Sequence, residues 1–141
     1  MKGLSARWVL GAVLVACSSE KPAAPAGLRV PLPDGWVATP RGGGLEVGPK
    51  GRVTATLEVR AKDVPRSLEL SRAVTAEGAT NVTQEDGEGY AAVRYSLGAG
   101  REGFLAVKKT ATKTVWCAST AKASAQDIDD GLALCRSIGS E

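Results

Sequence analysis

The eight residues from Val53 to Arg60 alternate between apolar and polar side chains without a break. The apolar positions are Val53, Ala55, Leu57 and Val59, and the polar positions are Thr54, Thr56, Glu58 and Arg60. A period of two with one polar face is typical of an antiparallel strand that is covered on one side. The pattern therefore predicts a strand here, joined through Gly48–Gly51 to an earlier strand around Leu45–Val47.

The next segment changes to a helical period. Its stripe consists of Leu70, Ala73, Val74 and Glu77, which are spaced at 0, +3, +4 and +7. Pro65 suits the first turn of a helix, and Gly78 suits the position just beyond the last turn. We therefore expect a helix of moderate amphipathicity near residues 65–77.

Four further strands are expected after this helix. They are Asn81–Glu85, Tyr90–Leu97, Gly103–Lys109 and Lys113–Ser119. Asp86–Gly89 is a hairpin signal, and the other connections are short, so the strands should form an antiparallel meander. Earlier in the chain, Pro33–Gly35 predicts a turn that leads Trp36 into the core. Gly42–Gly44 lacks the Gly-Lys-Ser/Thr of a phosphate-binding loop and is interpreted as a flexible connection.

A second helix is expected near residues 125–138. Ser124 and Asp127 resemble a capping box, in which the two side chains satisfy backbone amides at the helix start. The predicted apolar face consists of Ile128, Leu132, Cys135 and Ile138, and Gly139 would end the helix. Asp127, Asp129 and Asp130 lie near the positive end of the helix dipole. This explains them better than a calcium site, because no Gly-containing ligand loop surrounds them.

The first sixteen residues have the organisation of an export signal. Lys2 and Arg7 precede an uncharged apolar run at residues 8–16. Nine helical residues span about 14 Å, less than half of a hydrocarbon core of roughly 30 Å, which argues against a permanent transmembrane helix. Residues 1–16 are therefore predicted to be a signal peptide.

The apolar run ends in Leu14-Val15-Ala16-Cys17, which resembles the lipobox of bacterial lipoproteins. The resemblance implies that the thiol of Cys17 carries diacylglycerol and that cleavage before it makes Cys17 the first mature residue. The alternative is an ordinary signal peptide that contains a Cys by chance. Ser18 follows, where the best-known sorting rule uses Asp to retain lipoproteins at the inner membrane, so the outer membrane is favoured.

Residues 17–27 are rich in Pro, Ala and Ser and lack apolar periodicity, which predicts a lipidated tether. Extended at about 3.1 Å per residue, its residues let the domain stand roughly 30 Å off the membrane. The remaining residues, 28–141, suit one domain, because a chain of 141 residues is too short for two independent cores. The formal net charge of +3 falls by two when Lys2 and Arg7 are removed, so no overall field favours nucleic acid.

Residue content excludes most catalytic and metal chemistry. The chain has no His, and no Gly-x-Ser-x-Gly or Ser-x-x-Lys string pairs a nucleophile with a base. We therefore expect no catalytic residue, no cofactor and no metal site. Glu85, Asp86 and Glu88 could hold a cation weakly, but a solvated turn is favoured. Two interpretations also apply to a basic group that consists of Arg101, Lys108, Lys109, Lys113 and Lys122. The group could contact anionic lipid headgroups, but a solvated strand face is favoured.

The three Cys residues predict one disulfide. Lipidation would consume Cys17, which leaves Cys117 and Cys135 in a compartment that keeps thiols oxidised. Cys117 lies two residues after Val115, so both side chains point to the same face of their strand. Cys135 lies on the expected buried face of the last helix. If that helix packs on the Val115 face, the two Cys face each other. The alternative is two separate buried thiols.

The expected order of elements is a strand hairpin, a helix, a four-strand meander and a helix. With Pro33–Trp36 at its start and Leu134–Ile138 at its end, this order resembles the PsbP-like fold. The resemblance covers about residues 28–139 and implies an α+β domain, an antiparallel sheet of six to seven strands flanked by two helices. Because PsbP-like proteins are mostly non-catalytic, it also implies an assembly or interaction module.

The sequence is consistent with two functions. The first is a membrane-anchored bacterial envelope lipoprotein that faces the periplasm and acts, without catalysis, as an interaction or assembly module for an envelope protein partner. The alternative is a small-ligand or lipid-binding lipoprotein with a pocket between sheet and helix. A filled sheet–helix interface with an exposed apolar patch would favour the first, and an apolar cleft of several hundred cubic ångströms would favour the second.

Overall fold

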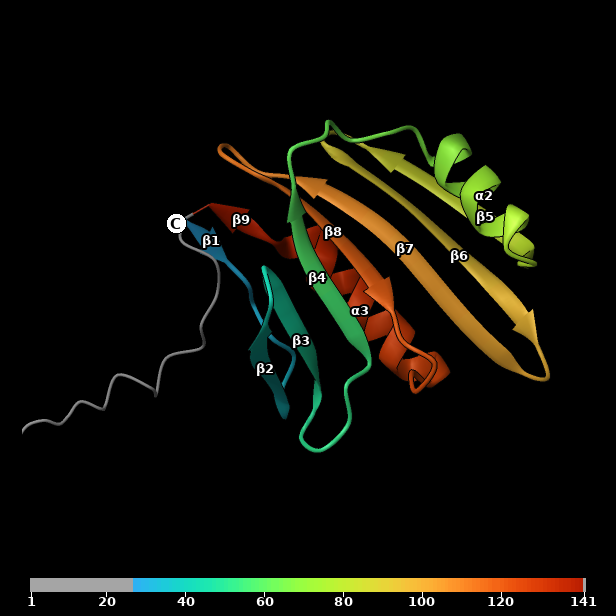
Figure 1. Ribbon diagram of the computed structural model, residues 1–141, viewed down its shortest axis with the longest axis horizontal. Helices are drawn as coiled ribbons and strands as arrows, with labels where there is room; N and C mark the ends of the chain where they lie inside the picture. The colour runs from blue at the N-terminus through green and yellow to red at the C-terminus, as the bar shows by residue number, and fades with distance from the viewer. Residues whose placement is uncertain (1–26, 141) are drawn as a thin grey trace, which may run out of the picture.

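Antiparallel pairing joins seven strands into one sheet in the computed structural model, which describes residues 27–140. The strands are β2 (Trp36–Arg41), β3 (Gly44–Pro49), β4 (Ala55–Arg60), β5 (Thr80–Gly87), β6 (Tyr90–Gly98), β7 (Arg101–Lys109) and β8 (Thr114–Ser119). Their order across the sheet is β2-β3-β4-β8-β7-β6-β5 (Figure 1). The predicted meander is therefore correct, and β4 adds the first hairpin to it by pairing with β8.

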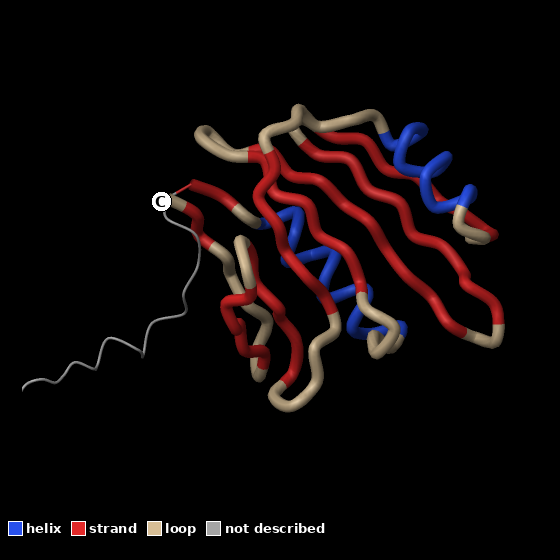
Figure 2. The backbone as a smooth tube through the Cα atoms, in the orientation of Figure 1, coloured by secondary structure: helices blue, strands red, loops and turns tan. Residues whose placement is uncertain are grey.

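Two helices complete the α+β domain. The helix α2 (Ser67–Ala76) carries the chain from β4 to the far edge of the sheet, where β5 begins. The helix α3 (Ala125–Ser137) follows β8 and crosses behind the sheet in the view of Figure 1. Both lie within a residue or two of the positions expected from their apolar periods, and Figure 2 shows how strand-rich the remainder is.

The two ends of the described chain meet. The short strands β1 (Leu28–Arg29) and β9 (Gly139–Ser140) pair antiparallel, with Leu28 opposite Ser140. Gly139 was expected to end the last helix, but α3 ends at Ser137 and Gly139 begins β9. This pairing places the N-terminal edge of the domain beside its C-terminal edge (Figure 1).

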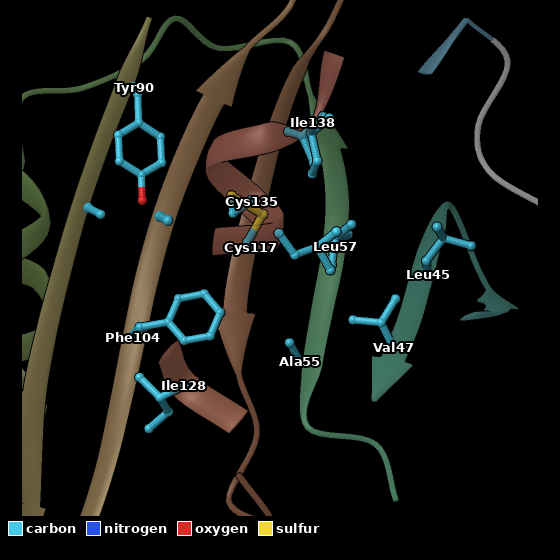
Figure 3. Close-up of a cluster of buried hydrophobic side chains, with 14 of the residues drawn as sticks. Leu45, Val47, Ala55, Leu57, Tyr90, Phe104, Cys117, Ile128, Cys135 and Ile138 are labelled. Carbon is cyan, nitrogen blue, oxygen red and sulfur yellow. A yellow bond between two sulfur atoms is a disulfide. The ribbon is translucent and has the colours of Figure 1, made fainter. Parts of the chain in front are cut away.

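The hydrophobic core divides into two clusters, one on each face of the sheet. The larger cluster lies under α3, where Phe104, Ile128 and Cys135 are fully buried (Figure 3). The smaller cluster lies under α2 and includes Leu70, Val74, Ala91, Val93 and Val107. The strands β6 and β7 supply alternate residues to both clusters, as expected from the period of two in a strand.

Three local predictions were wrong for identifiable reasons. Gly42–Gly44 is no flexible connection, because Arg41 pairs with Gly44 and leaves a two-residue hairpin turn in which Gly42 has a φ of 58°. Thr54 was expected on a solvent face but is 1% exposed. It precedes β4 and packs where Gly48, having no side chain, lets the chain approach closely. Ala73 is exposed, because α2 buries only the line of Ser67, Leu70 and Val74.

Candidate interaction surfaces

The predicted disulfide is present between Cys117 on β8 and Cys135 on α3 (Figure 3). Their Cα atoms lie 6.3 Å apart, and both residues are almost fully buried. Val115 belongs to the same cluster as Cys117, whereas Trp116 packs against the cluster on the opposite face. The bond thus ties α3 to the sheet, and its burial makes it a structural element rather than an accessible reactive site.

The predicted lipidation site, Cys17, lies outside the described residues, as do the signal peptide and most of the predicted tether. No helix within residues 27–140 combines the length and apolar character needed to cross a membrane. Likewise, nowhere in this range do three or more Cys, Asp or Glu residues gather as a metal site would require.

The acidic residues at the start of α3 make contacts within the fold, and the predicted capping box is present. Ser124 and Asp127 form a reciprocal capping box, with Ser124 N–H donating to Asp127 at 2.9 Å. Asp127 also pairs with Arg52, a partner that the sequence pattern did not suggest. Asp129 pairs with Arg94.

The acidic hairpin is likewise occupied by contacts within the fold. Asp86 accepts a 2.9 Å hydrogen bond from the backbone N–H of Ser67 and a second from its hydroxyl, so it caps α2 from a neighbouring strand. These hydrogen bonds hold the pKa of Asp86 below its ordinary value. Glu85 pairs with Arg136 at 2.7 Å. Glu88 remains on the exposed turn, so the solvated-turn interpretation holds for one residue of the three.

Arg136 also lies over the ring of Tyr90, with its guanidinium carbon 5.3 Å from the ring centre. Tyr90 is 5% exposed, and burial raises the pKa of its hydroxyl while Arg136 opposes that effect. Lys108 donates to the backbone carbonyl of Arg136. No local pattern in the sequence indicates the group formed by Glu85, Tyr90, Lys108 and Arg136, because its members come from β5, β6, β7 and α3 and meet only through the fold.

Part of the α2-side face of the sheet is not covered by α2. The open sheet face, as we name it, consists of four half-buried residues on neighbouring strands: Tyr95, Leu105, Trp116 and Ala118. Arg60 lies over the Trp116 ring at 4.8 Å, and the buried Trp116 Nε1 has no hydrogen-bond partner among the described residues. α2 packs on β5 and β6 and leaves this region uncovered. Among the aromatic residues of the domain, Trp36, Tyr90 and Phe104 are buried, whereas Tyr95 and Trp116 are partly exposed.

A cleft of about 390 Å³ lies on the other face, where β5 and β6 extend beyond α3. This α3-side cleft is lined by Thr83, Gln84, Glu85, Ala92, Val93, Arg94 and Leu132. Arg94 is engaged by Glu102 at 2.9 Å and by Asp129, and these carboxylates raise the pKa of its guanidinium despite the opposing effect of burial. The cleft therefore has a small apolar floor at Ala92 and Leu132. Its charged lining residues, Glu85 and Arg94, are already engaged in ion pairs within the fold.

A second cleft, of about 310 Å³, lies at the end of the sheet. This end cleft is lined by Val59, Arg60, Ala61 and the continuous run Lys109–Thr114. The structure divides the basic group expected from the sequence. Lys109 and Lys113 lie at this end, whereas Arg101 and Lys122 lie at the opposite end of the sheet. A single basic strand face is therefore not formed.

No protein-family model matches the chain, and no curated protein has a matching sequence. Among solved structures, the chain is similar to cyanobacterial PsbP (CyanoP) from Synechocystis sp. PCC 6803, a solution structure. The two share 13% sequence identity over 86% of this chain and 96% of that chain, with a TM-score of 0.42. At this level the likeness assigns no activity or partner to the chain.

Proposed function

We propose that the chain is a bacterial envelope lipoprotein whose single domain, residues 28–141, acts as a non-catalytic interaction or assembly module. The main support for this proposal is the presence of the open sheet face. Leu105 and Trp116 remain partly exposed at the centre of a sheet whose opposite face is filled by α3. An apolar, aromatic patch on an otherwise well-packed domain is typical of a surface that binds another protein.

The cysteine residues support an exported location. Cys117 and Cys135 are joined in a buried disulfide, and disulfides persist in the oxidising compartments outside the cytoplasm. The remaining Cys17 closes the lipobox-like motif. We accordingly propose cleavage after residue 16, acylation of Cys17, a tether at residues 17–27 and a domain that faces the periplasm. Ser18 favours the outer membrane over the inner.

The absence of catalysis is proposed on chemical grounds. The chain has no His, and the carboxylates at Asp86 and Asp127 are engaged in capping helices. A carboxylate with its pKa held low is a poor general base near neutral pH. A protein partner therefore suits the described residues better than a substrate does.

Anchoring is tested by mass spectrometry of the mature N-terminus in a bacterial host. We expect a diacylated Cys17 as the first residue, and we expect Cys17→Ala to abolish that species and release the protein from membranes. A Cys17→Ala protein with the same membrane-bound mass would refute the anchor.

The interaction surface is tested by site-specific photo-crosslinking in intact envelopes. A photoreactive residue replaces Leu105 in the open sheet face, and in a matched control it replaces the exposed Lys50 in a distant turn. A discrete protein adduct from position 105 that is absent from position 50 supports the proposal. Equal or absent adducts from both positions would contradict it.

A second function, binding of a small ligand or lipid, is favoured by the α3-side cleft. Its volume of about 390 Å³ is within the range of ligand sites, and Ala92 and Leu132 provide an apolar floor. Native mass spectrometry of the protein purified from envelopes would show a bound small molecule. Leu132→Trp would displace that molecule, whereas Ala133→Trp on the exposed side of α3 would not. An unchanged mass in both variants would exclude this cleft as the binding site.

A further inference from the structure

The end of the sheet that receives the predicted tether is well defined. Gly27 lies against the turn between β7 and β8, where a Cβ built on it would be 3.8 Å from Thr112 Oγ1 and 4.0 Å from Lys113 Cε. β9 is fixed to the same turn, because Ala111 N–H donates to Ser140 Oγ at 3.0 Å. β1, β9 and this turn lie together in Figure 1. We name this part of the domain the anchor-side end.

The anchor-side end contains the end cleft, whose lining includes cations and no carboxylate. Arg60, Lys109 and Lys113 line the cleft, and Lys62 follows its lining residue Ala61 in the chain. Lys109 is 56% exposed, and its partner Asp63, 3.8 Å away, is 96% exposed, so this pair is weak. Within residues 27–140, neither Lys62 nor Lys113 has a carboxylate within 4.0 Å.

The backbone of the turn argues for a surface of headgroups rather than one bound phosphate. Ala111 N–H donates to Ser140, and the amides of Thr112 and Lys113 donate to Thr110 Oγ1 at 3.3 and 3.0 Å. Thr110 N–H donates to the Lys113 carbonyl at 2.7 Å. All four amides are therefore satisfied inside the fold, and no nest of free N–H groups remains to enclose an anion. Recognition is left to the lysine ammonium groups, because the Arg60 guanidinium is paired with Glu58 at 2.7 Å and lies over the Trp116 ring.

We propose that the anchor-side end docks on anionic phospholipid headgroups, with Lys109 and Lys113 as its principal contacts. This inference rests on the proposed lipid anchor, which would hold this end within roughly 30 Å of the bilayer. At such a short range, the high effective concentration lets a weak surface contact orient the domain. Each cation close to an anionic membrane raises affinity by about fivefold.

The test compares two charge-matched variants of the full chain, both carrying Cys17→Ala so that acylation does not enter the measurement. Lys109→Gln with Lys113→Gln alters the anchor-side end. Lys50→Gln with Lys122→Gln removes the same charge at the opposite end of the sheet, where β3 and β8 finish. Cosedimentation is measured with phosphatidylcholine vesicles, with and without phosphatidylglycerol.

We expect the first variant to lose about tenfold or more of its affinity for vesicles that contain phosphatidylglycerol. The control should lose less than about twofold, and phosphatidylcholine alone should not distinguish them. Equal losses in the two variants would show that net charge alone is responsible and would overturn the proposal. So would saturable binding of inorganic phosphate at the turn without any preference for phosphatidylglycerol.

The fate of the anchor is measured separately. If Cys17 is not acylated but the vesicle preference is retained, the anchoring proposal fails and the docking surface stands. If Cys17 is acylated but the two double variants behave alike, the docking surface fails and the anchor stands.

Discussion

At the scale of single residues, Asp127 shows how a carboxylate can stabilise without catalysing. Burial raises its pKa, but the hydrogen bonds from Ser124 and Arg52 outweigh burial and hold the pKa below the ordinary value of 3.8. A group with a depressed folded-state pKa stabilises the fold above its unfolded pKa. That contribution is lost as the pH falls through the folded pKa, so it should disappear only in acid.

We predict that Asp127→Asn lowers the free energy of unfolding by about 1–2 kcal/mol at pH 7. The amide still offers a capping oxygen but carries no charge for Arg52, so the decline in stability below about pH 4 should become shallower. Urea unfolding from acid to neutral pH measures both effects. Asp130→Asn on the same helix, whose side chain accepts from Gln126, is the control and should change stability by less than about 0.5 kcal/mol. An acid profile unchanged by Asp127→Asn would contradict the assignment.

A substitution at Gly131 tests how closely α3 packs against the sheet. It lies inside α3, where replacing Gly by Ala normally stabilises a helix by about 1 kcal/mol. Here the new Cβ would lie 2.8 Å from Cε2 of Phe104, a ring with no exposed surface. Overpacking of this kind costs about 1–3 kcal/mol, so Gly131→Ala should be destabilising on balance. Thermal unfolding measures it against Gly43→Ala, where the added methyl meets nothing within 4 Å. A raised melting temperature for Gly131→Ala would disprove the close contact.

At the scale of elements, short-range sequence patterns predicted the strands and helices whose formation depends on neighbouring residues in the chain. The alternation before Arg60 and the capping residues at Ser124 gave β4 and α3 because those signals lie within the element itself. β2 was not predicted as a strand, because it contains Pro40 and is completed only by its pairing with β3. The pairing of β4 with β8 joins segments separated by the whole meander, and no short-range signal encodes it.

The candidate surfaces were less predictable than the elements for the same reason. The alternation of the strand and the period of the helix indicated the faces on which Cys117 and Cys135 lie, and these two faces predicted the disulfide. The ion pair of Arg52 with Asp127 joins residues 75 positions apart, so only the fold brings it together. The open sheet face depends on which strands α2 covers, a choice that sequence periodicity leaves undetermined.

The helix α2 provides a prediction about an element stabilised from outside itself. Its N-cap residue, Arg66, makes no side-chain capping hydrogen bond, and Asp86 on β5 supplies the acceptor for Ser67 N–H instead. Asp86→Ala should therefore lower hydrogen-exchange protection of the α2 amides severalfold while leaving α3 unchanged. Since the pKa of Asp86 is held low by Ser67, this protection should persist from neutral pH down to about pH 4 and fall below it.

The control for α2 comes from the same hairpin. Glu88→Ala removes a carboxylate from the exposed turn and should leave the exchange of α2 unchanged. If both substitutions loosen α2 equally, the effect belongs to the charge of the hairpin and not to the cap. If Asp86→Ala loosens α3 as much as α2, the cap has no local role.

At the scale of the whole molecule, the two core clusters share their central strands. On β6, Ala92 belongs to the cluster under α3 and its neighbours Ala91 and Val93 to the cluster under α2. The strand β7 divides in the same way between Ala106 and Val107. Neither cluster can lose its strands without exposing the other. This arrangement predicts that the domain unfolds as one cooperative unit, as small single domains usually do.

The last prediction tests that cooperativity with one substitution in each cluster. Leu70 is 3% exposed under α2, and Ile128 is fully buried under α3. Leu70→Ala and Ile128→Ala should each lower the free energy of unfolding by about 2–5 kcal/mol. In both variants, near-ultraviolet and far-ultraviolet circular dichroism should report a single transition with the same midpoint, because the sheet couples the layers. Leu97→Ala, at a position 36% exposed, is the control and should change stability by less than about 0.5 kcal/mol. A separate early transition in Leu70→Ala, with the disulfide-linked layer still folded, would show that α2 and its cluster form an independent unit and would refute the prediction.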